Sequence, residues 1–208
     1  MLDSLLSGQL LFAALVLGAL YALIGLGLNL VYGTMRLLNI AHGDVMMLGA
    51  YLAFWWFTLT GLSPLVMLPA AAVGAAGLGL ALYAALFRRQ LAGASSVAQV
   101  EARSLLIFFG VSVVIQNLVA WAFSATPRAY RYLDGVVRWG DTAMTGNRIV
   151  ALVVALAVLA AILLFLARTL FGMEIRALIQ HRDAARVVGI HVERVQMVAI
   201  ALGFGTAG

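Results

Sequence analysis

The chain has 208 residues, of which 64% are hydrophobic and 10% are charged, whereas about a quarter of the residues in a soluble globular protein are charged. This composition is typical of an integral membrane protein and excludes an ordinary soluble domain. All 13 basic residues are arginine. Without lysine the chain has no P-loop and no Schiff base, so any ATP that drives this protein must be bound by another chain. We also expect no cofactor. The arginines lie in short segments between apolar runs, where membrane topology accounts for them, so we expect no nucleic-acid partner.

Apolar runs follow one another along the chain at residues 10–31, 45–62, 65–87, 104–123 and 149–166, and a last run starts at 195. A transmembrane helix needs about 20 mostly apolar residues, which the run at 45–62 nearly reaches and the last run does not before Gly208. We therefore predict an all-α, polytopic transmembrane helix bundle that forms one domain over residues 1–208 and is incomplete at its carboxyl end. Small residues at a spacing of four predict close helix packing at Ala14, Gly18 and Ala22, and at Ala71, Ala75 and Gly79.

Arginine counts predict the topology. Alternating spans place Arg36, segment 88–103 and segment 167–194 on one side with nine arginines, against four in segment 124–148. The positive-inside rule then predicts a cytoplasmic loop at 167–194 and an external loop at 124–148 that lies on the membrane surface. A re-entrant segment at 33–44 would reverse this assignment for the first span.

Four polar side chains lie close together between the first two runs, in "VYGTMRLLNIAHGDV". Arg36, Asn39, His42 and Asp44 are flanked by Gly33 and Gly43. This pattern predicts a broken or re-entrant segment near residues 33–44, which is tolerated in lipid only where protein buries it or where it lines a cavity. The alternative is an ordinary cytoplasmic turn. A single histidine without a second ligand at a suitable spacing predicts no metal site.

Three further polar side chains fall inside spans. Asn29 lies late in the first span, and Gln116 and Asn117 lie beyond the middle of the fourth. Such residues either hydrogen-bond to a neighbouring helix or line a polar path.

Residues 171–196, "FGMEIRALIQHRDAARVVGIHVERVQ", form the second polar segment. Ile175, Leu178 and Ile179 recur on one face of an amphipathic helix. Asp183 can cap a short helix that runs to Val188, with Gly189 after its end. The segment is either a membrane-surface helix or a docking helix for a soluble partner.

Together, these segments resemble the integral-membrane permeases of branched-chain amino-acid ABC importers. The similarity lies in "YALIGLGLNLVYGTMRLLNIAHGDVMMLGAYLA" at 21–53, in "IQN" at 115–117 and in 174–195, which is similar to the family's cytoplasmic loop. Asp183-Ala184-Ala185-x-x-x-Gly189 is similar to the Glu-Ala-Ala-x-x-x-Gly pattern of importer permeases, with aspartate in place of glutamate and without the later Ile-x-x-Pro.

The resemblance implies a permease subunit in the bacterial inner membrane rather than an enzyme. It also implies cytoplasmic ABC ATPase subunits, a second permease subunit, an external solute-binding protein, surrounding membrane lipid, and further spans after residue 208. The solute is expected to be a branched-chain or other small amino acid. Urea or short amides, a passive channel or ion-coupled carrier, and a structural subunit without a path are the alternatives. The expected path residues are Asn29, Arg36, Asn39, His42, Asp44, Gln116 and Asn117, and the expected ATPase-coupling residues are Arg176, Asp183, Ala184, Ala185, Arg186 and Gly189.

Overall fold

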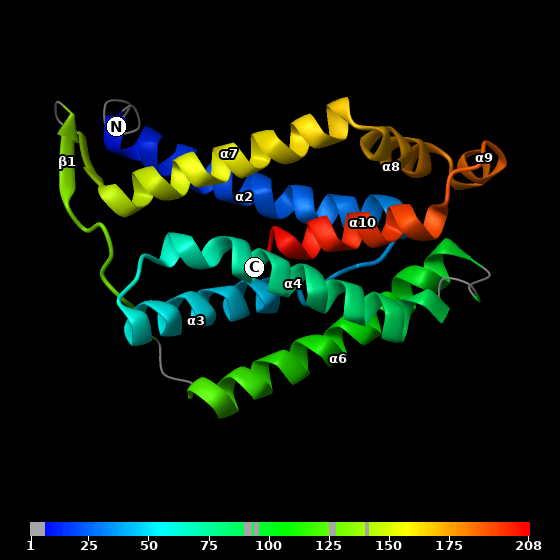
Figure 1. Cartoon of the computed structure of the whole chain (residues 1–208), viewed down its shortest axis with the longest axis horizontal. Helices are drawn as coiled ribbons and strands as arrows, with labels where there is room; N and C mark the ends of the chain where they lie inside the picture. Colours follow the sequence, from blue (N-terminus) through cyan, green and yellow to red (C-terminus); the bar gives the residue numbers. More distant parts are fainter. Residues whose placement is uncertain (1–6, 90–92, 94–95, 125–127, 140–141) are drawn as a thin grey trace.

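A computed structural model describes residues 7–89, 93, 96–124, 128–139 and 142–208. These residues fold almost entirely into helices (Figure 1). In chain order the elements are α2 (Gly8–Met35), α3 (His42–Thr60), the 3-10 turn η1 (Pro64–Met67), α4 (Leu68–Leu82), the π-helical turn η2 (Tyr83–Phe87), α6 (Val97–Phe123), strands β1 (Val136–Trp139) and β2 (Thr142–Thr145), α7 (Gly146–Arg168), α8 (Leu170–Gln180), α9 (Arg182–Val187) and α10 (Val192–Gly205).

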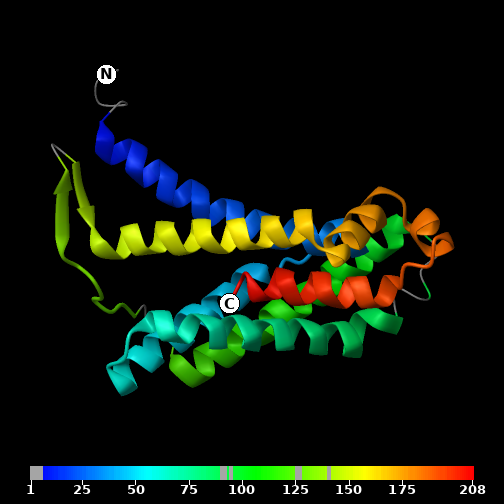
Figure 2. The ribbon, with the colours of Figure 1, turned by 45° about the horizontal axis from the view of Figure 1, so that its top comes forward.

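Four helical segments of the described residues are long and apolar enough to cross a membrane. They are α2, α6, α7 and the continuous segment Pro64–Phe87. The predicted all-α polytopic membrane fold is therefore confirmed. The helix α3 has 19 residues, about 28 Å of helix, and it begins inside the bundle rather than at one of its ends (Figures 1 and 2).

The long helices run roughly along one axis, so the molecule has two ends. One end carries the strands β1 and β2 and is called the hairpin end; the other carries α8 and α9 and is called the α8–α9 end (Figure 1). The segment Pro64–Phe87 and α7 both finish at the α8–α9 end, and α6 begins there. The segments predicted to be cytoplasmic and external thus lie at opposite ends of the bundle.

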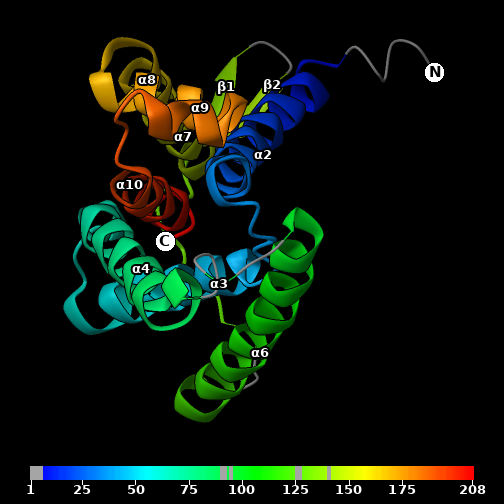
Figure 3. The ribbon, with the colours of Figure 1, turned by 90° about the vertical axis from the view of Figure 1, so that its right-hand side faces the viewer.

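The centre of the bundle is α10, which lies between α2 and α4 (Figure 3). Its side chains Val195, Ala199, Ile200 and Phe204 are fully buried. Glycines allow the neighbouring backbones to approach. A Cβ placed on Gly203 would lie 2.8 Å from the carbonyl oxygen of Gly27, and one on Gly79 would lie within 3 Å of the Phe204 ring.

The two rows of small residues differ in what covers them. Ala71, Ala75 and Gly79 are buried against α10, as predicted. The row Ala14, Gly18 and Ala22 is exposed, and a Cβ on Gly18 would meet no atom within 4 Å, so no described helix of this chain packs on it. The packing face of α2 runs instead through Val16, Ala19 and Gly27, because that face points toward the other helices.

The helix α6 packs at the side of the bundle against α3 and η2. The ring of Phe108 stacks on Phe87 with 4.6 Å between centroids. The hydroxyl of Ser104 accepts a hydrogen bond of 3.0 Å from the backbone N–H of Leu38. This bond ties α6 to the chain segment between α2 and α3.

Part of the segment expected to be a loop at 124–148 forms an antiparallel hairpin. Val136 pairs with Thr145, and Val137 with Met144. The β-branched residues favour extended backbone, a preference too weak over four residues to predict a strand from sequence. A hydrogen bond of 2.6 Å between the hydroxyls of Tyr132 and Ser63 joins the segment before the hairpin to the end of α3.

The glycine contacts at α10 generate a test of stability. We expect Gly203→Ala to lower the free energy of unfolding by about 1–3 kcal/mol, because its methyl group would press on the backbone of Gly27 and on Val31. Gly18→Ala is the matched control, and its stability should be unchanged or slightly raised because its Cβ enters open space. The measurement is the thermal midpoint of each variant in the same detergent; equal midpoints would contradict the packing role.

Candidate translocation path and coupling surface

The helix α2 ends at Met35, and the next residue, Arg36, adopts a left-handed backbone with φ of 57°. Its N–H donates to the carbonyl of Tyr32, and its guanidinium lies over the Tyr32 ring at 5.3 Å. Gly33 is still helical, and a Cβ there would touch Ile179 at 3.1 Å. The break predicted near residues 33–44 thus occurs at Arg36 rather than at either glycine.

The chain turns back after Arg36 and enters α3 at His42 inside the bundle (Figure 1). Asn39 and His42 lie in this turn and are buried, with 7% and 3% of their surface exposed. Neither the amide of Asn39 nor either ring nitrogen of His42 has a hydrogen-bond partner among the described residues. The ring of His42 lies 3.3 Å from the position of a Cβ on Gly27, so it sits beside the crossing of α2 and α10.

Unpartnered buried polar groups are costly, at about 1–3 kcal/mol each. Asn39 and His42 are neighbours on one short turn, and both have this cost. Native proteins keep such groups where another component supplies the missing partner or where function requires them. The pair therefore marks the strongest candidate site among the described residues.

Asp44 and Gln116 come together across α3 and α6. The amide nitrogen of Gln116 donates to the carboxylate of Asp44 at 2.9 Å and to the hydroxyl of Ser112 at 3.1 Å. Asp44 is partly exposed and Gln116 is exposed on the surface of this chain. Four of the predicted path residues thus lie close to the start of α3. Asn39 lies in the turn before this helix, His42 and Asp44 lie in its first turn, and Gln116 contacts Asp44 from α6.

The other predicted path residues lie apart from this site. The amide of Asn117 donates to the carbonyl of Val113 on its own helix at 2.7 Å and is exposed. Asn29 lies in a separate groove of about 330 Å³ between α2, α7 and α8, which Arg176 also lines. Arg36 stands on the outer side of the turn, against Tyr32. The structure therefore does not bring these three into one site.

The predicted short helix around Asp183 is α9. Its amino-terminal cap is His181, whose Nδ1 accepts a hydrogen bond of 3.2 Å from the N–H of Ala184. The predicted cap, Asp183, lies inside the first turn instead, because the extended backbone that a cap requires occurs at His181. Gly189 follows the helix with φ of 87°, as the pattern predicted.

The exposed side of α9 contains residues that sequence reasoning missed. Ala185 is buried in a cluster with Ile175 and Leu178 of α8. Val187 and Val188 point outward, with 86% and 75% of their surface exposed. The sequence signal that could have indicated this apolar surface is the pair of valines directly before the glycine that ends the helix. Of the predicted coupling residues, Asp183, Ala184 and Arg186 lie on the exposed side of α9.

No three His, Asp or Glu side chains of the described ranges lie close enough together to hold a metal ion.

The contact between Asp44 and Gln116 can be measured with a double-mutant cycle. We expect Asp44→Ala and Gln116→Leu to show a coupling free energy of about 0.5–1.5 kcal/mol in unfolding, because each substitution removes one partner of the hydrogen bond. Asn117→Leu, one residue further on, should show no coupling to Asp44→Ala, since its amide bonds within its own helix. Additive effects for Gln116 would contradict the contact.

Comparison with known proteins assigns the chain to a family. The family model described as "Branched-chain amino acid transport system / permease component" matches residues 10–208. The chain is 28% identical to the high-affinity branched-chain amino acid transport system permease protein BraD of Pseudomonas aeruginosa, over 96% of this chain and 67% of that protein. It is 27% identical to the probable branched-chain amino acid transport permease protein LivH of Methanocaldococcus jannaschii, over 96% of this chain and 64% of that protein.

The high-affinity permease protein LivH of Escherichia coli is 25% identical, over 96% of this chain and 67% of that protein. The chain thus spans about two thirds of the length of these relatives. No solved structure matches the chain. Because the family model covers nearly every residue of the bundle, the chain belongs to the family of branched-chain amino acid permease components, and it is a multi-pass membrane transport protein rather than an enzyme.

Proposed function

We propose that the chain is a transmembrane permease subunit of an ABC importer in the bacterial inner membrane. It forms part of the path for branched-chain or other small amino acids, and a separate cytoplasmic ATPase drives it. The names of the relatives support the solute class. A second permease subunit and an external solute-binding protein complete the proposed assembly.

The observation that carries the path is the unpartnered pair of Asn39 and His42. An alternating-access carrier exposes its polar lining in one state and buries it in another, as helices rock around the site. In the present state the crossing of α2 and α10 covers His42. Separation of α10 from α2 would uncover the His42 ring without breaking any hydrogen bond that its nitrogens make to the described residues.

The polar groups around the turn between α2 and α3 suit the two charges of an amino acid. The carboxylate of Asp44 can attract an ammonium group, and the unpartnered amide donor of Asn39 can bind a carboxylate. The apolar remainder of the bundle suits an aliphatic side chain. Urea and short amides lack the ammonium group and would use the amides alone.

The proposed coupling surface is the exposed side of α9 together with Val187 and Val188 at the end of this helix. A soluble partner that docks on a short helix needs exposed apolar anchors, and Val187 and Val188 supply them. Asp183 and Arg186 add polar contacts at the rim, and Gly189 ends the helix. Arg176 lies one helix earlier, in the groove beside α7.

Uptake tests the path. In the complete assembly, reconstituted in vesicles with ATP, we expect Asn39→Leu and His42→Leu each to reduce leucine uptake at least about tenfold, because an apolar side chain removes a solute contact. Thr58→Val is the control, since its hydroxyl bonds only to the carbonyl of Phe54 on its own helix. Normal uptake by both leucine variants would remove the path assignment.

The same vesicles separate the alternatives. Uptake of urea in preference to leucine would assign the chain to the amide carriers of this family. Flux without ATP would assign it to a passive channel or an ion-coupled carrier.

Co-purification tests the coupling surface. We expect Val187→Asp and Val188→Asp to abolish retention of the ATPase while the permease still elutes as a folded species, because a charge at an apolar anchor opposes docking. Val137→Asp makes the same change at an exposed position of the hairpin end and should retain the ATPase. Equal ATPase retention by all three variants would place the docking surface elsewhere.

A further inference from the structure

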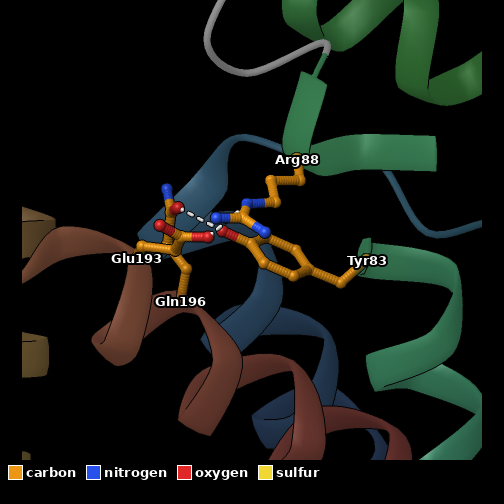
Figure 4. A network of polar contacts seen from close by, with 4 residues as sticks. All are labelled: Tyr83, Arg88, Glu193 and Gln196. Carbon is orange, nitrogen blue, oxygen red and sulfur yellow. Dashed lines mark hydrogen bonds and ion pairs between the residues drawn. The ribbon is translucent and has the colours of Figure 1, made fainter. Parts of the chain in front are cut away.

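A separate group of polar side chains lies at the α8–α9 end (Figure 4). The hydroxyl of Tyr83, in the π-helical turn η2, donates to Oε1 of Gln196 on α10 at 3.0 Å. Nε of Arg88 forms an ion pair with Glu193, also on α10. These four side chains border a pocket of about 210 Å³, which Arg182, Arg186 and Val192 complete.

The lining of this pocket is positively charged. Three guanidinium groups, those of Arg88, Arg182 and Arg186, face a single lining carboxylate, and Arg88 already pairs with it. Asp183 approaches Arg186 only to 3.9 Å, with 83% of its side chain exposed, so solvent weakens this pair. Arg182 has no ion pair among the described residues. Burial and the nearby charge of Arg186 both lower the pKa of Arg182.

Two hydrogen-bond donors of the pocket lining lack an acceptor. Nε of Arg182 and Nε2 of Gln196 are buried and have no partner among the described residues. Gln196 is only 3% exposed, and its amide oxygen already accepts from Tyr83, so only its nitrogen remains unused. Unpaired donors beside uncompensated positive charge call for an anionic acceptor.

The position of the pocket suggests the source of that acceptor. Arg88 directly follows Phe87, the last residue of the membrane-spanning segment Pro64–Phe87. The pocket therefore lies where an apolar span meets water, the depth at which the phosphates of phospholipids lie. Arginine matches phosphate particularly well, because its planar fork binds two oxygens at once.

We propose that the pocket between η2, α9 and the start of α10 is a binding site for a phosphate group, held by Arg182, Arg186 and the amide of Gln196. Arg88 keeps its ion pair with Glu193 and adds positive charge at the rim. The phosphate belongs either to a phospholipid headgroup or to a soluble phosphate compound. The site goes beyond the proposed transport role and does not depend on it.

Binding to the purified, delipidated chain in an uncharged detergent tests the site. Native mass spectrometry compares retention of dioleoyl phosphatidylglycerol with retention of dioleoylglycerol, which has the same acyl chains and no phosphate. In parallel, the thermal midpoint is measured in inorganic phosphate and in chloride at equal ionic strength. Preferential retention of phosphatidylglycerol assigns the site to a lipid headgroup, and stabilisation by inorganic phosphate alone assigns it to a soluble phosphate; either result supports the proposal.

Arginine variants inside and outside the pocket distinguish binding at the pocket from general attraction to the positive charge of the chain. Arg182→Gln should weaken phosphate binding about tenfold or more, because it removes a charged donor. Arg186→Gln, at an exposed side chain, repeats the test if Arg182→Gln does not fold. Arg194→Gln removes the same charge from an exposed position of α10 outside the pocket and should change binding less than about twofold.

Three results would overturn the proposal. One is that the chain binds neither phosphate probe. Another is that the pocket variants and Arg194→Gln lose the same affinity, which would show attraction to net charge only. The last is that a peptide of ten glutamates binds with dependence on Arg182 while both phosphate probes fail, which would assign the pocket to an acidic protein segment.

Discussion

The close approach of α10 to α2 and α4 is the contact on which the bundle depends. Helices in lipid gain little from burying apolar side chains, since the surrounding acyl chains are equally apolar, and they associate mainly through tight packing. Gly203 meets the backbone of Gly27 on one side, and Phe204 fills the space above Gly79 on the other. No larger residue fits at these glycines without moving a backbone or an aromatic ring. The position of α10 in the centre of the fold therefore follows from three glycines on three different helices.

The same crossing also covers the candidate path. His42 lies beside Gly27, so the contact that brings α10 onto α2 also keeps water from the imidazole. A core designed only for stability would place apolar side chains there, because they carry no desolvation cost. An unpartnered imidazole beside this contact therefore fits the proposed path, in which the contact would open during transport.

Sequence reasoning succeeds here where one short-range pattern decides the outcome. The apolar runs predict the helices, and Ala71, Ala75 and Gly79 predict a packing face that α10 does occupy. The same spacing at Ala14, Gly18 and Ala22 has no partner among the described helices, because periodicity shows that the side chains of a face are small but not which helix covers it. The cap of α9 fell on His181 rather than Asp183 because the backbone conformation, and not the side chain alone, selects a cap. The contact of Asp44 with Gln116 joins positions 72 residues apart, and no local pattern encodes that pairing.

The geometry gives the proposed coupling a mechanical route. The N–H of Ile190 bonds to the carbonyl of Ala185 at 3.0 Å, so α9 is fastened to the residues that lead directly into α10. From Val192, α10 runs about 17 Å to Gly203, where it crosses α2, and a helix transmits displacement over that length with little bending. A partner that moves α9 would therefore move the residues beside His42 as well. The pocket at Arg182 lies at the start of α10, between α9, α10 and η2. A phosphate bound there would connect α9 and α10 to η2, at the end of the segment Pro64–Phe87. It would therefore favour the position of α10 in which α9, α10 and η2 lie together.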